Sequence, residues 1–335
     1  MVQARRRIGT AAKRIVTIRN AGPRRSFCHD GLVIVRRSLV GAIVAVGFLA
    51  SACSTGGGSE AATSTTSAAA TNGATIPSDG QGTILVEAGR GQDARIVSLD
   101  PVTLEYETIS GDQPAHVPDI NDAGTELVWA GPSSTDPTWP DVYLRDLTTG
   151  ETERLGSGGA PTWTFDQEAL LVSRKDGVYR MELDGSAELV RGGEPLSATE
   201  VADGVFVFGD DTTLTIVEDR QDTVVFDGGE QCAPDDWDLS PDGAGLAFTI
   251  GCTEPDDPEN GLYVYDLGTE ETTPVYDGDV HGAAWSPDGK SIATTFLPDR
   301  ESEQNELWVV NAKTGEPKVL RSDGSFVWPT WIKGS

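Results

Sequence analysis

From about residue 83 to the C-terminus, short apolar runs alternate with polar turns along the whole chain. Within many runs the apolar side chains recur at every second position, as in the segment Gly261–Leu267, GLYVYDL. A period of two predicts β-strands, and we find no convincing 3.6-residue period that would indicate an amphipathic helix. The turns between runs are rich in Asp-Gly and Thr-Gly, where glycine supplies a positive φ without steric cost. The pattern therefore predicts an all-β domain.

The strands recur as a unit of about 40 residues, and such a period is typical of repeat architectures. Its clearest marker is Ser-Pro-Asp-Gly, at Ser240–Gly243 and again at Ser286–Gly289, with weaker copies at 121–124, 164–167 and 202–204. Each unit holds four short strands, which predicts one blade of a β-propeller. Five units are complete. The N-terminal part (83–109) has three strands without an innermost one, and the C-terminus supplies one near 330–332. We therefore predict that residues 81–335 form a six-bladed propeller closed by a composite blade.

The motif W-S-P-D-G-K-S-I-A at Trp285–Ala293, followed by L-W-V-V-N-A-K-T-G-E at Leu307–Glu316, resembles the TolB-type WD40-like repeat. The resemblance covers residues 83–335 and implies a six-bladed propeller, in agreement with the strand count. TolB itself carries an additional α/β domain before its propeller, for which this sequence has no room. The role of TolB in docking envelope lipoproteins is therefore not carried over.

The first 52 residues differ from the rest and are predicted to be a signal segment. Arg36 and Arg37 precede a 13-residue apolar run, 38–50, and then Ser51, Ala52 and Cys53. This run is shorter than the roughly 20 residues of a membrane-spanning helix, and the order of regions is that of a secretory signal. Because the run starts late, we hypothesise that the start codon is assigned too early and that residues 1–32 are not translated.

Cys53 follows small residues and precedes a Ser/Thr/Gly-rich stretch, an arrangement that resembles a bacterial lipobox. The resemblance implies cleavage before Cys53 and lipidation of its thiol; an ordinary signal peptide with an incidental cysteine is the alternative. Residues 53–80 cannot bury enough apolar surface to fold, so we expect them to be a flexible tether. The protein is expected to be exported and lipid-anchored to the bacterial cell membrane, on its outward or periplasmic face.

The net negative charge limits the classes of partner that the protein is expected to bind. Residues 1–52 hold 10 of the 25 Lys and Arg residues and one of the 53 acidic residues, so the remainder holds 15 and 52, near −37. Nucleic acids and anionic lipid surfaces would repel such a domain, so we expect no nucleic-acid partner and membrane contact only through the anchor. Solubility alone accounts for the acidity, although an acidic surface also attracts cations.

Two of the four cysteines, Cys232 and Cys252, remain in the propeller. An even pair in an exported domain predicts a disulfide, with two free thiols as the alternative. The bridge is expected to hold the acidic loop 253–259.

The Ser-Pro-Asp-Gly residues are explained by turn chemistry, so candidate site residues are sought on the opposite face. The repeats can be aligned on the first residue of the turn motif, which is Asn121, Ser240 or Ser286. In this alignment His116, Asp235 and His281 each lie five residues before that position. Two imidazoles and a carboxylate at a channel mouth could bind a divalent metal or exchange protons, whereas solvated loop histidines are the structural alternative. Trp139, in an insert between strands, is the candidate partner contact, unless it folds back over its own blade.

These patterns favour a non-catalytic, monomeric envelope lipoprotein whose propeller binds a protein or an envelope polymer. A metal-assisted enzyme of the lyase or lactonase type, using His116, Asp235 and His281, is the second interpretation, and a small-ligand sensor is the third. No cofactor is expected apart from the divalent cation of the second interpretation. Propellers support all three functions, so the fold alone does not decide among them.

Overall fold

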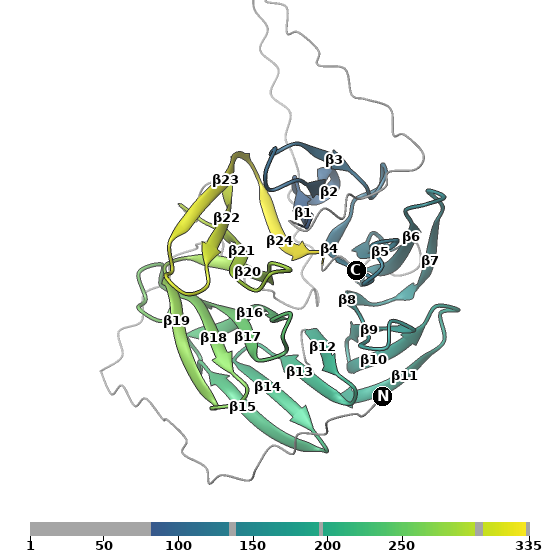
Figure 1. Ribbon diagram of the computed structural model, residues 1–335. Helices are drawn as coiled ribbons and strands as arrows, with labels where there is room; N and C mark the ends of the chain where they lie inside the picture. The colour runs from purple at the N-terminus through teal and green to yellow at the C-terminus, as the bar shows by residue number, and fades with distance from the viewer. Residues whose placement is uncertain (1–81, 134–138, 194–196, 299–303, 333–335) are drawn as a thin grey trace, which may run out of the picture.

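The computed structural model describes residues 82–133, 139–193, 197–298 and 304–332. These residues form β-strands and one short 3-10 helix, η1 (Gly91–Asp93). The strands make six antiparallel sheets of four strands each, arranged around a central axis (Figure 1). The predicted six-bladed β-propeller is confirmed.

The blades are numbered in chain order, each from its innermost strand outward. Blade 1 contains β24 (Phe326–Trp331), β1 (Ile84–Ala88), β2 (Arg95–Leu99) and β3 (Tyr106–Thr108). Blade 2 contains β4 (His116–Ile120), β5 (Glu126–Gly131), β6 (Asp141–Asp146) and β7 (Thr152–Ser157). Blade 3 contains β8 (Gly159–Trp163), β9 (Ala169–Arg174), β10 (Gly177–Glu182) and β11 (Ala187–Gly192).

The second half of the ring follows the same plan. Blade 4 contains β12 (Ser197–Ala202), β13 (Val205–Gly209), β14 (Thr213–Glu218) and β15 (Gln221–Asp227). Blade 5 contains β16 (Cys232–Leu239), β17 (Gly245–Cys252), β18 (Gly261–Asp266) and β19 (Glu271–Asp277). Blade 6 contains β20 (Val280–Trp285), β21 (Ser291–Phe296), β22 (Asn305–Asn311) and β23 (Pro317–Gly324).

Blade 1 joins the two ends of the domain, as the strand count predicted. β24 pairs with β1 in an antiparallel register that places Trp331 opposite Ile84. The amide of Ile332 extends this ladder by donating to the carbonyl of Thr83 at 2.9 Å. Closure in this way pairs the first and last strands with each other, so neither is left as an open edge of the ring.

The innermost strands begin earlier than the sequence pattern indicated. In these two repeats the apolar pattern places the innermost strands at Trp237–Leu239 and Ala283–Trp285, whereas β16 begins at Cys232 and β20 begins at Val280. Both strands contain a register shift that interrupts the period of two, so the alternation cannot be followed through it. At the shift in β20, Gly282 has φ 77°, and a Cβ there would lie 2.6 Å from Pro329 Cδ. Only glycine fits so close to the neighbouring blade.

The core lies between blades rather than in one central mass. Each of six apolar clusters spans one boundary, and the largest, around Phe248 and Trp237, joins blades 4 and 5. Trp163, Trp285 and Trp331 share one register of the innermost strands, and they are buried in three different boundaries. Sheets packed face to face in this way hold the ring together by side-chain packing.

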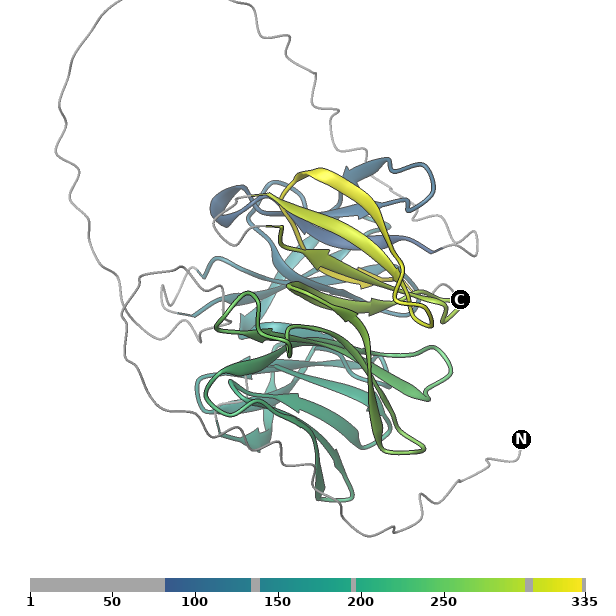
Figure 2. The same ribbon diagram turned by 90° about the vertical axis from the view of Figure 1, so that its left-hand side faces the viewer.

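The ring has two faces, which Figure 2 shows edge-on. The turn face carries the turns from first to second strand and from third to fourth strand of each blade. The loop face carries the second-to-third connections and the connections between blades. Gly82 lies at the turn face, because its Cβ position is 2.8 Å from Pro287 Cγ in the Ser-Pro-Asp-Gly turn of blade 6. The chain therefore enters the propeller from the turn face.

Cys53, the apolar run 38–50 and the tether 53–80 lie outside the described residues. Within the described ranges, no helix has the length and apolar character needed to cross a membrane.

Candidate functional site

The Ser-Pro-Asp-Gly turns satisfy their own polar groups. In blade 5, Ser240 Oγ donates to Asp242 Oδ1 at 2.6 Å and accepts from the amide of Gly245 at 2.9 Å. In blade 6, Ser286 and Asp288 repeat the contact at 2.8 Å. The Ser240 hydroxyl lowers the pKa of Asp242, with the Ala244 amide adding to the effect. A carboxylate held by its own turn has a structural role, as the sequence indicated.

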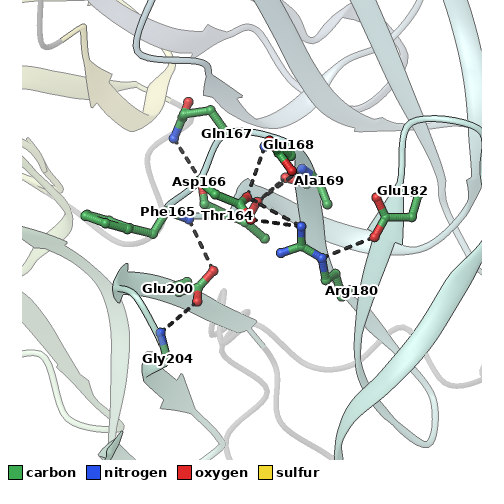
Figure 3. Close-up of polar contacts among 10 residues, drawn as sticks. All are labelled: Thr164, Phe165, Asp166, Gln167, Glu168, Ala169, Arg180, Glu182, Glu200 and Gly204. Carbon is green, nitrogen blue, oxygen red and sulfur yellow. Dashed lines mark hydrogen bonds and ion pairs between the residues drawn. The ribbon is translucent and has the colours of Figure 1, made fainter.

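Blade 3 builds the same turn with threonine in place of serine (Figure 3). Thr164 Oγ1 donates to Asp166 Oδ1 at 2.6 Å, and Arg180 Nη2 pairs with Asp166 Oδ2 at 3.1 Å. Glu200 of β12 accepts from the Phe165 amide at 3.2 Å and from the Gly204 amide at 3.1 Å. One carboxylate thus joins the turn of blade 3 to the tight Asp-Gly hairpin of blade 4.

On the loop face, the structure brings Asp235 and His281 together. His281 Nδ1 lies 3.2 Å from Asp235 Oδ2 across the boundary between blades 5 and 6. Its Nε2 lies 3.4 Å from Asp279 Oδ1, a residue two positions earlier in the chain. The imidazole side chain is 18% exposed, and each carboxylate side chain is 9% exposed. An imidazole between two carboxylates must donate from both nitrogens, and that requires the protonated form.

The pKa of His281 agrees with the assignment of this side chain as protonated. Burial lowers the pKa of His281, but the hydrogen bonds to Asp235 and Asp279 and their negative charges raise it to about 9. His281 is therefore a cation near neutral pH that links two blades. With a proton on each nitrogen it has no lone pair to offer a metal ion.

The repeat register grouped His116 with Asp235 and His281, but His116 has a different partner in the structure. Its Nδ1 lies 2.9 Å from Glu87 Oε1 of β1, and the amide of Val117 donates to Glu87 Oε2 at 3.3 Å. The hydrogen bond to Glu87 raises the pKa of His116, against the opposing effect of burial. Among the described residues, the ligand atoms of His116, Asp235 and His281 do not converge on one ion-sized site.

The predicted disulfide is present and joins Cys232 to Cys252, which face each other on β16 and β17. Asn260 orders the loop that follows. It accepts from the Cys252 amide at 2.6 Å and donates to the carbonyls of Glu254 and Pro255 at 2.8 and 3.0 Å. The loop at the end of blade 5 is thus held by one amide side chain as well as by the covalent bridge.

Trp139 lies one residue before Pro140 and is half-buried. Its indole Nε1 is screened from solvent and has no hydrogen-bond partner among the described residues. The indole therefore offers only part of its surface at the loop face.

Sequence reasoning missed the carboxylates that hold the blades to one another. Asp119 accepts from the Trp163 amide at 2.7 Å, and Asp238 accepts from the Trp285 amide at 2.8 Å, each across a blade boundary. Both lie two residues before the aligned turn position, so the repeat alignment itself contained this signal. Glu87 and Asp279 gave no such signal, because only the folded chain places them beside a histidine.

Two open grooves lie on opposite faces. A groove of about 440 Å³ on the turn face runs between the two Ser-Pro-Asp-Gly turns, beside Trp285. A second groove, of about 390 Å³, lies where blades 3 and 4 meet on the loop face, beside Phe208 and Arg191. The Arg191 guanidinium stacks on Phe208 at 4.7 Å and pairs with Asp222 at 3.2 Å, so its charge is already engaged.

No protein-family model matches the chain, and no curated protein matches its sequence. Its structure is similar to one from Agrobacterium tumefaciens that is assigned as TolB, at 12% identity with a TM-score of 0.54, over 75% of this chain and 98% of that one. The chain thus has a TolB-like propeller fold.

A GH74 enzyme structure from Niastella koreensis matches at 10% identity and a TM-score of 0.50, over 73% of this chain and 46% of that one. A Bacteroides fragilis structure assigned as a 6-phosphogluconolactonase has 12% identity and a TM-score of 0.49, over 76% and 98% of the two chains. Identities this low establish the fold alone.

Proposed function

We propose that the chain is a non-catalytic cell-envelope lipoprotein whose propeller is a binding scaffold for a protein or an envelope polymer. Lipidated Cys53 would hold the domain to the outward or periplasmic face of the membrane. The tether 53–80 would then span about 30 Å on average, as a flexible chain of its length does. The acidic domain itself would not bind an anionic membrane.

The position of Gly82 is the observation that carries this proposal. Because the chain enters beside Pro287, the tether side of the domain is the turn face. The loop face then lies on the side of the domain opposite the tether, where the anchor leaves it accessible to a partner. Irregular connections on a rigid scaffold are where binding residues concentrate in other folds.

The composition of the loop face supports a binding role. It carries the ordered loop after Cys252 and the segment that contains Trp139, whereas the turn face consists of short turns that satisfy their own polar groups. A partner therefore finds more varied chemistry on the loop face.

The alternative of a metal-assisted lyase or lactonase has less support. His281 is held between Asp235 and Asp279, and His116 is held by Glu87. Neither imidazole is poised to act as a base or a ligand without first breaking a contact between blades.

Photocrosslinking tests the proposed orientation and role. A photoreactive amino acid would be placed at the exposed loop-face positions Asp112 and Asp256, one at a time, in the anchored full chain. Matched controls carry it at Thr149 and Lys313, exposed on the turn face. We expect the same crosslinked species from both loop-face positions and from neither control, with a lower yield when Trp139→Ala is added.

Crosslinks that arise only at Thr149 and Lys313, or none at any position, would contradict the proposal. Lipidation is checked separately, because Cys53→Ala should move the protein from the detergent phase to the aqueous phase in phase partitioning. An unchanged distribution would refute the anchor and leave the loop-face result to be judged by itself.

A further inference from the structure

Four metal-ligating side chains meet at the loop-face end of blade 5. They are Cys232 of β16, Cys252 of β17, and Asp257 and Glu259 of the loop that leads to β18. One ligand atom from each lies within 4.8 Å of all the others. Both cysteines are buried and both acids are half-buried. In the structure the two sulfur atoms are joined as a disulfide.

Contacts other than the disulfide also hold these residues in place. Backbone pairing runs along β16 and β17 from Cys232 opposite Cys252 to Leu239 opposite Leu246. Asn260 fixes the loop through its three hydrogen bonds, and Glu259 donates its amide to Asp257 Oδ1 at 2.9 Å. Reduction of the bridge would therefore leave two thiols side by side, with the two carboxylates still next to them.

The local charge favours a cation. Residues 221–289 contain neither lysine nor arginine, and the one histidine in that range, His281, is held by Asp235 and Asp279. Asp257 and Glu259 form no ion pair with any described residue, although their carboxylates lie within 4.8 Å of each other. Two like charges so close together repel, and a bound cation would remove that repulsion.

We propose that Cys232, Cys252, Asp257 and Glu259 form a redox-gated site for one thiophilic divalent cation of the Zn²⁺ class. A dithiol reductant breaks the S–S bond, transfers two electrons and two protons, and itself becomes a disulfide. The two thiols then lose their protons as both sulfurs bind the metal, which releases two protons. In the reverse step a small-molecule disulfide takes up the two electrons by thiol–disulfide exchange and, with two protons, becomes two thiols; the protein disulfide reforms and the ion is expelled.

The donor set and spacing suit this class of ion. Zinc binds thiolate sulfur at about 2.3 Å and carboxylate oxygen at about 2.0–2.2 Å in a tetrahedron, which places neighbouring ligand atoms about 3.3–3.8 Å apart. Side-chain rotation in the reduced form can separate the sulfurs by this amount while the strands remain paired. Hard cations such as Ca²⁺ and Mg²⁺ prefer oxygen ligands only, so two thiolates select against them. This proposal is independent of the lipoprotein function.

Cobalt titration tests the site, since Co²⁺ reports thiolate ligation by a charge-transfer band and tetrahedral geometry by its visible spectrum. The full chain would carry Cys28→Ser and Cys53→Ser, which leaves Cys232 and Cys252 as its only thiols. After reduction with a phosphine and its removal, we expect one equivalent of Co²⁺ to bind with both spectral features and to be displaced by Zn²⁺. The oxidised chain should show neither feature.

Two matched variants distinguish ligation of the metal by Asp257 and Glu259 from nonspecific attraction of cations to an acidic loop. Asp257→Asn with Glu259→Gln should weaken binding by more than about tenfold, as loss of metal-site groups does elsewhere. Glu254→Gln with Asp256→Asn removes the same charge from the same loop and should bind like the parent. Equal affinity in all three chains, or a reduced chain that binds no Co²⁺, would overturn the proposal.

If reduction unfolds the domain, circular dichroism of the reduced chain still tests the proposal. Zn²⁺ should then restore the β-sheet signal of the parent but not that of the variant lacking Asp257 and Glu259 carboxylates. A reduced parent that stays unfolded at saturating Zn²⁺ would overturn the proposal as well.

Discussion

The two faces of the propeller use their carboxylates differently. On the turn face, Asp242 and Asp288 accept hydrogen bonds from their own turns, so their contacts span only a few residues of sequence. On the loop face, Asp235 and Glu87 bind histidines 46 and 29 residues away, in neighbouring blades. The turn contacts recur with the repeat, whereas each of these two histidine–carboxylate contacts is particular to one boundary. The contacts of Asp242 and Asp288 therefore stabilise single blades, and the histidine contacts of the loop face differ from one boundary to the next.

Removing the buried cation of the loop face should have the largest effect on stability. His281→Leu removes the cation that faces the buried carboxylates of Asp235 and Asp279, and breaking a buried ion pair in this way costs about 3–5 kcal/mol. Denaturant unfolding would measure the loss. His116→Leu is the matched control and should cost less, because the His116 side chain is 36% exposed. Equal losses from the two substitutions would contradict the comparison.

Loss of the disulfide should be the next largest change. Cys232→Ser with Cys252→Ser releases a link between residues 20 positions apart, for which chain entropy predicts a loss of about 3 kcal/mol. Hydrogen exchange should rise first in the loop 253–259 and much less at the turn 286–289. Uniform exchange across both faces would show instead that the disulfide supports the whole ring.

Alkaline pH should weaken the loop face selectively. The pKa of His281 rises from 6.5 to about 9 on folding, so its contribution is complete below pH 6.5 and is lost as the pH rises through 9. We expect a loss on the order of 1–3 kcal/mol between pH 6 and pH 10. The same measurement on His281→Gln corrects for tyrosines and other groups, and the difference between the two chains should shrink toward high pH. A constant difference would contradict the assignment of His281 as a cation.

A turn-face substitution should have the smallest effect. Ser286→Ala removes the donor to Asp288 and the acceptor for the Ser291 amide, and should cost about 1–2 kcal/mol. Thr272→Ala, at an exposed strand position, is the control and should stay within about 0.5 kcal/mol of the parent. Thermal unfolding resolves the two, and a larger loss than that of His281→Leu would reverse the proposed ranking of the faces.

Much of the architecture could be predicted from local patterns. Alternation of side chains, together with Asp-Gly turns and their weaker copies, recurs along the chain, so these patterns identified the strands, the six blades and the composite closure at Ile84 and Trp331. The early starts of β16 and β20 could not be predicted, because a β-bulge removes the period of two on which the interpretation depends. The pairing of Cys232 with Cys252 followed from their being the two cysteines in the propeller region.

The candidate site was predicted only in part. Asp235 and His281 share one register of the repeat, and their side chains are in contact because equivalent positions in adjacent blades are neighbours. It could not show that Asp279 would occupy the other nitrogen, or that Glu87 would bind His116. These contacts depend on side-chain directions at one particular blade boundary.

By itself, the sequence determined the strands, the turns and the number of blades, because each depends on residues that are close together in the chain. Only the tertiary structure decided which charges meet, which face the chain enters, and which residues surround the disulfide. Those properties arise where different strands, loops and neighbouring blades pack against each other, and pairing energies there depend on distance and burial rather than on any periodic pattern.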